Sequence, residues 1–199
     1  MAEKTYKDEF LEIYEKNIKR EGSDRLLKWL LSSDFFTCPA STKYHLACEE
    51  GLLQHSLHVY YRLKEEVEHT DWAALGSEKP SDETIAITAL LHDVCKVNFY
   101  KADTKNVKNK DTGKWEQVPY YTIDDQLPYG HGEKSVMIVS SFMHLTREET
   151  FAIRWHMGGF DDSVKGGSYA LNGAYNMFPL CLLISVADIK ATYLDEKEN

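Results

Sequence analysis

The chain has 199 residues, 43% of them hydrophobic and 12% aromatic, and its formal net charge is −9. This length supplies one substantial core, so we expect a single domain over 1–199, with N-terminal helices in 1–36 and a core unit in 37–199. The acidic balance argues against non-specific DNA binding, which lysine and arginine usually drive by neutralising phosphates. It still allows an enzyme that takes a small phosphorylated substrate into a locally positive site.

The N-terminal segment is charged and amphipathic, and it has neither the apolar core of a signal peptide nor an 18-residue apolar stretch. The four cysteines show no C-x-x-C pairing and are typical of reduced thiols. We therefore expect a cytoplasmic protein without a membrane partner. The sequence does not indicate an oligomeric state.

Apolar residues recur with helical periodicity along most of the chain, which predicts a mainly α-helical fold. The first helix has an apolar stripe of Phe10, Leu11, Tyr14 and Ile18. Further helices are predicted over about 24–33 with Ser23 as N-cap, then over 52–68, 82–94, 147–156 and 177–194. Thr146 and Glu149 have the spacing of a capping box for the helix over 147–156.

Residues 97–124 break the helical pattern. The stretches VNFYKADTKNVK and KWEQVPYYTI are rich in Val, Tyr, Phe and Thr and flank a turn at Asp111-Thr112-Gly113. This predicts a small β-hairpin inserted into the helical fold. Its lysines, Lys101 and Lys105 among them, either form a flap that draws phosphates toward a site or simply solvate a loop.

Two histidines of the predicted helix over 52–68 have different environments. His55 shares an apolar stripe with Leu52 and Val59, so it should face the core. His58 shares a face with Arg62, so it should face water.

Polar side chains also end two apolar runs. His92 and Asp93 close the run in ALLHDVCK, Lys96 follows within one turn, and Asp188 is the lone acid on the apolar stripe of the last helix. Considered singly, each of these residues is typical of a buried polar residue whose hydrogen bonds are satisfied within the core. Together with His55, they form a set of imidazoles and carboxylates that suits a divalent metal, and metal binding is one way to offset the cost of burying charge.

His131 in GHGEKS and His156 in WHMGG add two imidazoles beside glycines. They could hold a second ion with Asp93 as a bridge, since paired ions about 3.5–4 Å apart clamp the attacking and leaving oxygens of a phosphoryl displacement. Asp161 either contacts substrate or caps a turn. The weaker candidates for substrate contact are Tyr44, His45 and Asp161.

The order His55, His92-Asp93, Asp188 resembles the H…HD…D signature of the HD-domain metal-dependent phosphohydrolases. GLLQHSLHV and ALLHDVCK are similar to that family's first two motifs, and GHGEKS and WHMGG resemble the extra histidine motifs of its two-metal members. The nearest likeness, over about residues 44–193, is to the HD domain of bacterial 3′–5′ exoribonucleases, without their OB-type domain. The resemblance implies an HD-domain helical bundle that carries the hairpin as an insertion.

The resemblance also implies two sets of metal ligands. Some two-metal relatives have a His-His pair where this chain has His156-Met157, so one ligand is missing from the pattern and the number of ions, one or two, stays open. Mixed His and Asp ligation favours Mn²⁺, Fe²⁺, Co²⁺ or Ni²⁺ over Mg²⁺. The implied ligands are His55, His92, Asp93 and Asp188 for the first ion, and Asp93, His131 and His156 for the second.

We therefore expect a phosphohydrolase, either a phosphomonoesterase or a phosphodiesterase, that acts on a nucleotide or another small phosphoester. Asp93 and the metal would activate water, and Lys96 would stabilise charge on the phosphoryl group. One alternative is a 3′–5′ exonuclease on single-stranded RNA or DNA, which the acidity disfavours. Another is a catalytically idle HD fold that binds a nucleotide as a regulator, which the complete ligand set disfavours.

Overall fold

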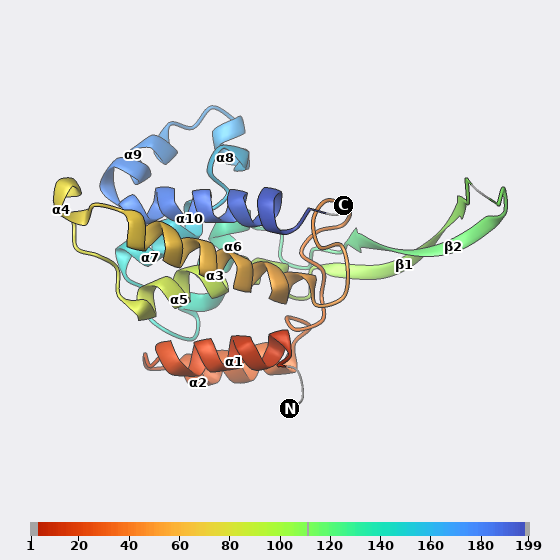
Figure 1. The fold of residues 1–199 in the computed structure, drawn as a ribbon, viewed down its shortest axis with the longest axis horizontal. Coiled ribbons are helices and arrows are strands. Elements are labelled where there is room, and N and C mark those ends of the chain that lie inside the picture. The colour runs from red at the N-terminus through yellow and green to blue at the C-terminus, as the bar shows by residue number, and fades with distance from the viewer. Residues whose placement is uncertain (1–3, 111, 198–199) are drawn as a thin grey trace.

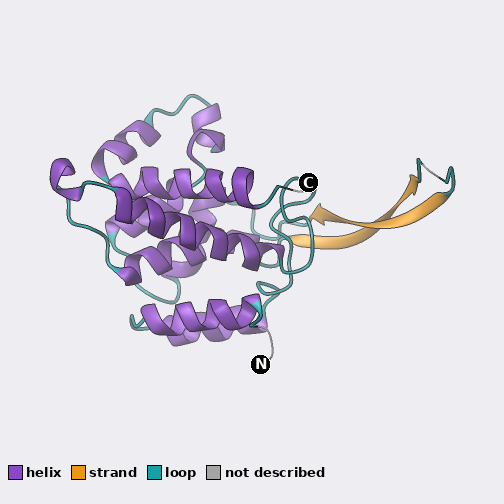
Figure 2. Ribbon diagram, in the orientation of Figure 1, coloured by secondary structure: helices purple, strands orange, loops and turns teal. Residues whose placement is uncertain are grey.

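The computed structural model describes residues 4–110 and 112–197 and shows a helical body from which one β-hairpin extends (Figures 1 and 2). The mainly α-helical fold with an inserted hairpin is thus confirmed. The α-helices are α1 (Tyr6–Asn17), α2 (Ser23–Ser32), α3 (Gly51–His69), α4 (Trp72–Leu75), α5 (Asp82–Leu91), α6 (His131–Ser140), α7 (Arg147–Trp155), α8 (Asp162–Lys165), α9 (Ala170–Met177) and α10 (Pro179–Lys190). Short 3-10 turns cover Val94–Lys96 and Gly158–Phe160, and a π-helical turn covers Ala191–Asp195.

Helix α3 supplies both core side chains and a site side chain. Its apolar stripe, including Leu52 and Leu63, is fully buried, and His55 on the same stripe is buried as predicted. Helices α5 and α10 pack against α3, while α1 contacts α3 and α5 and α7 contacts α10. One cluster of buried apolar side chains therefore runs from Phe10 in α1 to Ala191 after α10.

Helix α5 ends almost one turn earlier than the sequence predicts. Its last residue is Leu91, His92 is the C-cap, and Asp93 leaves helical geometry with φ −107° and ψ 17°. The Ala89 carbonyl, which a continued helix would offer to the backbone N–H of residue 93, accepts a hydrogen bond from Nδ1 of His92 at 2.7 Å. The chain then turns through Val94–Lys96, so Asp93 lies at a bend.

The predicted helix over 177–194 is broken near its start. Phe178 has an extended backbone with φ −133° and ψ 98°, and α10 begins at Pro179. A proline disfavours the α conformation of the preceding residue, which explains the break. At its other end, α10 continues as the π-helical turn, which brings Glu196 to His55 of α3.

The start of α2 also differs from the prediction. Ser23 is the first helical residue, and the N-cap is Gly22, which has a φ of 89°. A Cβ at Gly22 would lie 1.9 Å from the carbonyl oxygen of Phe142, so both the backbone conformation and the space require glycine.

The hairpin consists of β1 (Tyr100–Lys108) and β2 (Trp115–Ile123), which pair antiparallel with Tyr100 opposite Ile123. Figure 1 shows it extending away from the helices. Of the predicted turn residues, Asp111 lies outside the described residues, and Gly113 has the left-handed φ of 70°. The side chains of β1 beyond Tyr100 are exposed.

Within the described residues, no single helix is both long enough and apolar enough to cross a membrane. Helices α9 and α10, with the turn that follows, satisfy those criteria only as a pair, and the pair is bent by 109°.

A buried ion pair ties the segment after α1 to α5 and α7. The carboxylate of Glu149 accepts hydrogen bonds from Arg20 (2.6 and 3.0 Å), from Thr84 Oγ1 (3.0 Å) and from the backbone N–H of Thr146 (2.8 Å). The capping box of Thr146 and Glu149 is confirmed. Burial alone would raise the pKa of Glu149, but the bonds to Arg20 outweigh it and hold that pKa below its ordinary value.

Replacing Glu149 with Gln should lower the free energy of unfolding by about 3 kcal/mol, because it leaves the Arg20 guanidinium with only the more distant and more exposed carboxylate of Glu83, 3.4 Å away, as counter-charge. The folded-state pKa of Glu149 is depressed, so its stabilising contribution is complete above the unfolded pKa and is lost as pH falls through the folded pKa. Urea denaturation of parent and variant at pH 7, and then in steps below pH 4.5, should show the gap shrinking with acid.

The exposed change Glu78→Gln is the control, and it should stay within about 0.5 kcal/mol of the parent. A gap between Glu149→Gln and the parent that is independent of pH would contradict this account of the pair.

Candidate metal centre

The Oδ2 side of Asp93 contacts several of the predicted ligands. Nε2 of His55 lies 3.6 Å from Asp93 Oδ2 and 3.3 Å from Oδ1 of Asp188. Nε2 of His92 lies 3.6 Å from Asp93 Oδ2 and 3.2 Å from Nε2 of His55. Nζ of Lys96 lies 2.6 Å from the same oxygen. These side chains come from α3, α10 and the segment that ends α5, so core packing brings them together.

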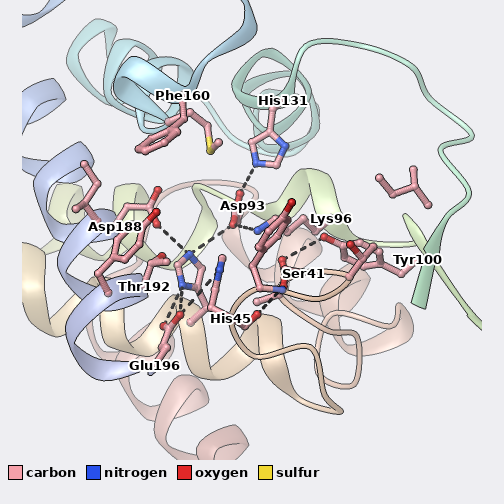
Figure 3. Close-up of a pocket in the computed structure, with 18 of the residues that line it drawn as sticks. Ser41, His45, Asp93, Lys96, Tyr100, His131, Phe160, Asp188, Thr192 and Glu196 are labelled. Atoms are coloured by element: carbon pink, nitrogen blue, oxygen red, sulfur yellow. Dashed lines mark hydrogen bonds and ion pairs between the residues drawn. The ribbon is translucent and has the colours of Figure 1, made fainter. Parts of the chain in front are cut away.

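The Oδ1 side of Asp93 faces a second group. Nε2 of His131 lies 2.7 Å from Oδ1, and Nε2 of His156 lies 3.3 Å from it. Sγ of Cys95, a residue that we did not single out from the sequence, lies 3.9 Å from the same oxygen. The structure therefore brings all the predicted metal ligands together around one carboxylate, while their role as ligands stays a prediction. Figure 3 shows Asp93 with His131, Asp188 and Lys96.

His92 and His156 occupy equivalent positions at the ends of two helices. Each is a C-cap, of α5 and α7 respectively, and each Nδ1 lies 2.7 Å from the carbonyl oxygen three residues earlier, that of Ala89 or of Ile153. A carbonyl only accepts, so Nδ1 carries the proton and Nε2 keeps a lone pair toward Asp93. A hydrogen bond of this kind orients imidazoles that bind metals.

Glu196 is the main site residue that sequence reasoning missed. Its buried carboxylate accepts hydrogen bonds from Nδ1 of His55 at 3.0 Å and from Nδ1 of His58 at 2.9 Å. Arg62 of α3 forms a two-point ion pair with Asp195, which holds this C-terminal segment in place. Because Glu196 accepts a hydrogen bond from Nδ1 of His55, the other ring nitrogen, Nε2, faces Asp93 and Asp188. Sequence reasoning missed Glu196 because a buried glutamate in an acidic segment after an apolar helix cannot be told from a solvent-exposed one by sequence alone.

The structure corrects the placement of His58. The side chain of this residue, predicted to face water, is only 28% exposed, and Glu196 is its partner. The periodicity of α3 correctly predicts the face on which His58 lies. It cannot show that the C-terminal segment packs over that face.

At the centre, ring nitrogens face carboxylate oxygens and one another, so each close contact needs a proton or a cation between its two atoms. Nε2 of His156 is buried and has no hydrogen-bond partner among the described residues, although Oδ1 of Asp93 lies 3.3 Å away. Nε2 of His55 and Nε2 of His92 approach each other to 3.2 Å. Such contacts cost free energy unless a cation or a shared proton lies between them. The donor set therefore fits a divalent cation.

The electrostatics of the site lead to the same conclusion. Burial disfavours a charged His55, yet the carboxylates of Asp188 and Glu196 outweigh it and raise the pKa of His55 to about 10. Burial lowers the pKa of His92 to about 3, so this ring is neutral. Burial alone would raise the pKa of Asp93, but its positive neighbours hold it well below the ordinary value. Ionised carboxylates here favour positive charge near His55, which a metal ion supplies while displacing the proton.

The centre opens into a cavity of about 830 Å³ (Figure 3). Tyr44 and His45, two of the predicted substrate contacts, line it together with Lys96. Burial and the nearby charge of His55 lower the pKa of His45 to about 4, so this imidazole is neutral. The wall also includes side chains that the sequence did not single out: Ser41, Thr42, Phe160, Lys165, Thr192, Tyr193 and Lys197.

Asp161, a predicted substrate contact, is used elsewhere. It is the N-cap of α8, where it accepts a hydrogen bond from the backbone N–H of Ser163 at 2.9 Å, and it forms an ion pair with Arg154 at 2.7 Å. Among the described residues, the cavity wall does not include Asp161. The turn-capping interpretation is therefore confirmed, and a contact between Asp161 and substrate stays an untested prediction.

Lys101 and Lys105 also lie away from the cavity. Both are exposed on β1, which extends away from the helical body, and Nζ of Lys105 lies over the ring of Tyr120. Of the hairpin residues, Tyr100 and Ile123 at its base line the cavity. The lysine-rich composition of the hairpin suggested a flap over the site, but composition does not show in which direction the hairpin extends.

Comparison with known proteins identifies one family. A protein-family model described as HD domain matches residues 52–192, which span the chain from the start of α3 to the turn after α10. The match therefore includes His55, His92, Asp93 and Asp188. No curated protein and no solved structure matches the chain.

Replacing Asp93 with Ala should remove most of the bound divalent metal, because its carboxylate contacts both groups of imidazoles. Elemental analysis after dialysis against Mn²⁺ measures the bound metal directly. His69→Ala, at the exposed end of α3, should retain the metal content of the parent. Equal metal content in Asp93→Ala and the parent would mean that the site is assigned wrongly.

Replacing Glu196 with Gln should weaken metal binding by about 10–100-fold, the usual cost of losing a group that orients a histidine ligand. Competition against a chelating dye measures the affinity. The change Glu78→Gln, at an exposed position outside α3 and the C-terminal segment, is the control. An unchanged affinity in Glu196→Gln would show that the carboxylate does not orient His55.

Proposed function

The chain belongs to the HD-domain superfamily of metal-dependent phosphohydrolases, and we propose that it hydrolyses the phosphoester of a nucleotide or of another small phosphorylated compound. One observation carries this proposal: a centre of closely spaced imidazoles and carboxylates, in which Nε2 of His156 has no hydrogen-bond partner among the described residues, opens directly into a cavity lined by lysines and aromatic rings. The cavity volume of about 830 Å³ lies within the range of about 300–1,000 Å³ that is typical of small-molecule sites.

The proposed ligands follow from the two sides of Asp93. When bound, a divalent ion polarises phosphoryl oxygens and lowers the pKa of water. The mixed nitrogen and oxygen donors favour Mn²⁺, Fe²⁺, Co²⁺ or Ni²⁺ over Mg²⁺, and the two sides support two ions. The proposed ligands are His55, His92, Asp93 and Asp188 on one side, and Asp93, His131 and His156 on the other.

Lys96 is suited to contact the phosphoryl group. Burial alone would lower its pKa, but the carboxylate of Asp93, 2.6 Å away, outweighs that effect and raises it, so the ammonium group stays charged. The side chain lines the cavity beside the proposed ligands. A fixed positive charge there stabilises negative charge that develops on phosphoryl oxygens.

The outer cavity favours a substrate with an aromatic base. Tyr44, Phe160 and Tyr193 line the cavity and are 76%, 51% and 52% exposed. Stacking of a base on such a ring contributes about 1–3 kcal/mol. Lys165 and Lys197 on the same wall supply charge for phosphates. These contacts support a nucleotide as the substrate.

The cavity favours a short substrate over a long strand. Exonucleases that follow single strands usually have a continuous basic groove, whereas the strand lysines Lys101 and Lys105 extend away from this site. A catalytically idle regulator would bind a nucleotide without releasing phosphate. Measuring phosphate release therefore distinguishes such a regulator from an enzyme.

With Mn²⁺ present, we expect hydrolysis of a mononucleotide at a kcat/KM similar to that for a dinucleotide or a 10-nucleotide strand. The reason is that the cavity offers a few local charges in a chain of net charge −9. The measurement compares the three substrates at two salt concentrations. A steep rise with length that salt suppresses would favour the exonuclease, and binding without product release would favour the regulator.

Asp93→Ala is the control for contaminating phosphatases, because it should lose turnover of all three substrates.

A further inference from the structure

The Oδ1 side of Asp93 has one imidazole fewer than the two-metal pattern that GHGEKS and WHMGG resemble. The residue after His156 is Met157, whose thioether is only a weak ligand for hard and borderline divalent ions. His131 and His156 then leave an ion on this side with two imidazoles and a carboxylate oxygen. A further donor from elsewhere in the chain would complete four-coordinate binding.

The bend after α5 brings a thiol to this side. Cys95 lies in the 3-10 turn that follows Asp93, and its backbone N–H donates a hydrogen bond to Oγ of Ser135 in α6 at 3.2 Å. This bond fixes the turn against the helix that begins with His131. Sγ of Cys95 consequently lies 3.5 Å from Nε2 and 3.5 Å from Nδ1 of His131, and 3.9 Å from Oδ1 of Asp93.

Two of the separations on this side match those of atoms that share a metal ion. With bonds of about 2.3 Å to sulfur and about 2.0 Å to nitrogen, tetrahedral geometry places the two ligand atoms about 3.5 Å apart. Sγ of Cys95 and Nε2 of His131 have this separation, and Nε2 of His156 lies 3.3 Å from Oδ1 of Asp93. Nε2 of His131 lies only 2.7 Å from the same oxygen and Sγ of Cys95 lies 3.9 Å from it, so these side chains must shift by a few tenths of an ångström or more to share one ion. Among the described residues, Nε2 of His156 is also one of two buried ring nitrogens without a hydrogen-bond partner, and it faces Oδ1 of Asp93, which independently indicates a ligand on this side.

The other buried cysteines lie in different surroundings. Sγ of Cys38 faces the backbone carbonyls of Phe35 and Lys96 at 4.0 Å, and Cys181 lies in the apolar core. Burial raises the pKa of both thiols, to about 12 for Cys181, so they remain protonated. Of the three, Cys95 is the one that the structure places beside a carboxylate and an imidazole.

We propose that Cys95 is a ligand of the second metal ion, together with Asp93, His131 and His156. This inference rests on the metal-dependent function proposed above. The thiol binds as thiolate and releases its proton to solvent when the ion enters. A thiolate ligand selects Zn²⁺, Fe²⁺ or Co²⁺ over Mg²⁺ and Mn²⁺, so the two sides of Asp93 have different metal preferences.

The test is a titration of the metal-free protein with Co²⁺, followed by absorption spectroscopy. A thiolate ligand gives a sulfur-to-cobalt charge-transfer band in the near ultraviolet, whereas nitrogen and oxygen ligands give only visible d–d bands. We expect the charge-transfer band in the parent when the second equivalent binds. It should be lost in Cys95→Ser, which should keep the visible bands of the first ion.

A variant with Cys38, Cys48 and Cys181 all replaced by Ala is the matched control, and it should keep the band because Cys95 is its remaining cysteine. This variant also decides the assignment if Cys95→Ser fails to fold. Cobalt binding without a charge-transfer band, or a band that is lost in the triple variant but kept in Cys95→Ser, would overturn the inference while leaving the metal centre intact. Absence of any cobalt binding by the parent would overturn the proposed function as well.

Discussion

Asp93 carries a negative charge where the segment after α5 meets α3, α6, α7 and α10, and an uncompensated charge in such a place would cost several kcal/mol. The fold compensates it with Lys96 on Oδ2 and with imidazoles on both oxygens. Removing any one of these groups would leave the others partly unpaired. The balance of this charge therefore depends on how closely the surrounding helices pack.

The ends of α5 and α7 meet that requirement in the same way. His92 and His156 each donate a hydrogen bond to a carbonyl of the last helical turn, which ends the helix and directs Nε2 toward Asp93. His55 reaches the same centre from the middle of α3, and the C-terminal carboxylate of Glu196 orients it. Backbone geometry and ligand orientation are thus set by the same hydrogen bonds, so we expect the site to be formed before a metal ion binds.

Periodicity and turn residues were enough to predict the helical fold and the hairpin, because both depend on local pattern. The meeting of His55 with Asp93 is a tertiary contact, and it was expected from their places at buried ends of apolar runs together with the resemblance to the HD signature. What the sequence could not show is which distant segment covers a given face. Glu196 reaches His55 and His58 only through the π-helical turn after α10, and Cys95 reaches the site through the early end of α5. Both depend on hydrogen bonds that no periodic pattern encodes. The direction of the hairpin, and hence the distance of its lysines from the cavity, is likewise a tertiary property.

The central claim is that Asp93 is shared by two metal ions with different ligands. Anomalous diffraction from crystals grown with Mn²⁺ and Zn²⁺, collected at the absorption edge of each metal, tests it most directly. The account predicts one peak beside Oδ2, among His55, His92 and Asp188, and another beside Oδ1. A single peak beside Asp93, or no peak within bonding distance of it in crystals that hold these metals elsewhere, would contradict it.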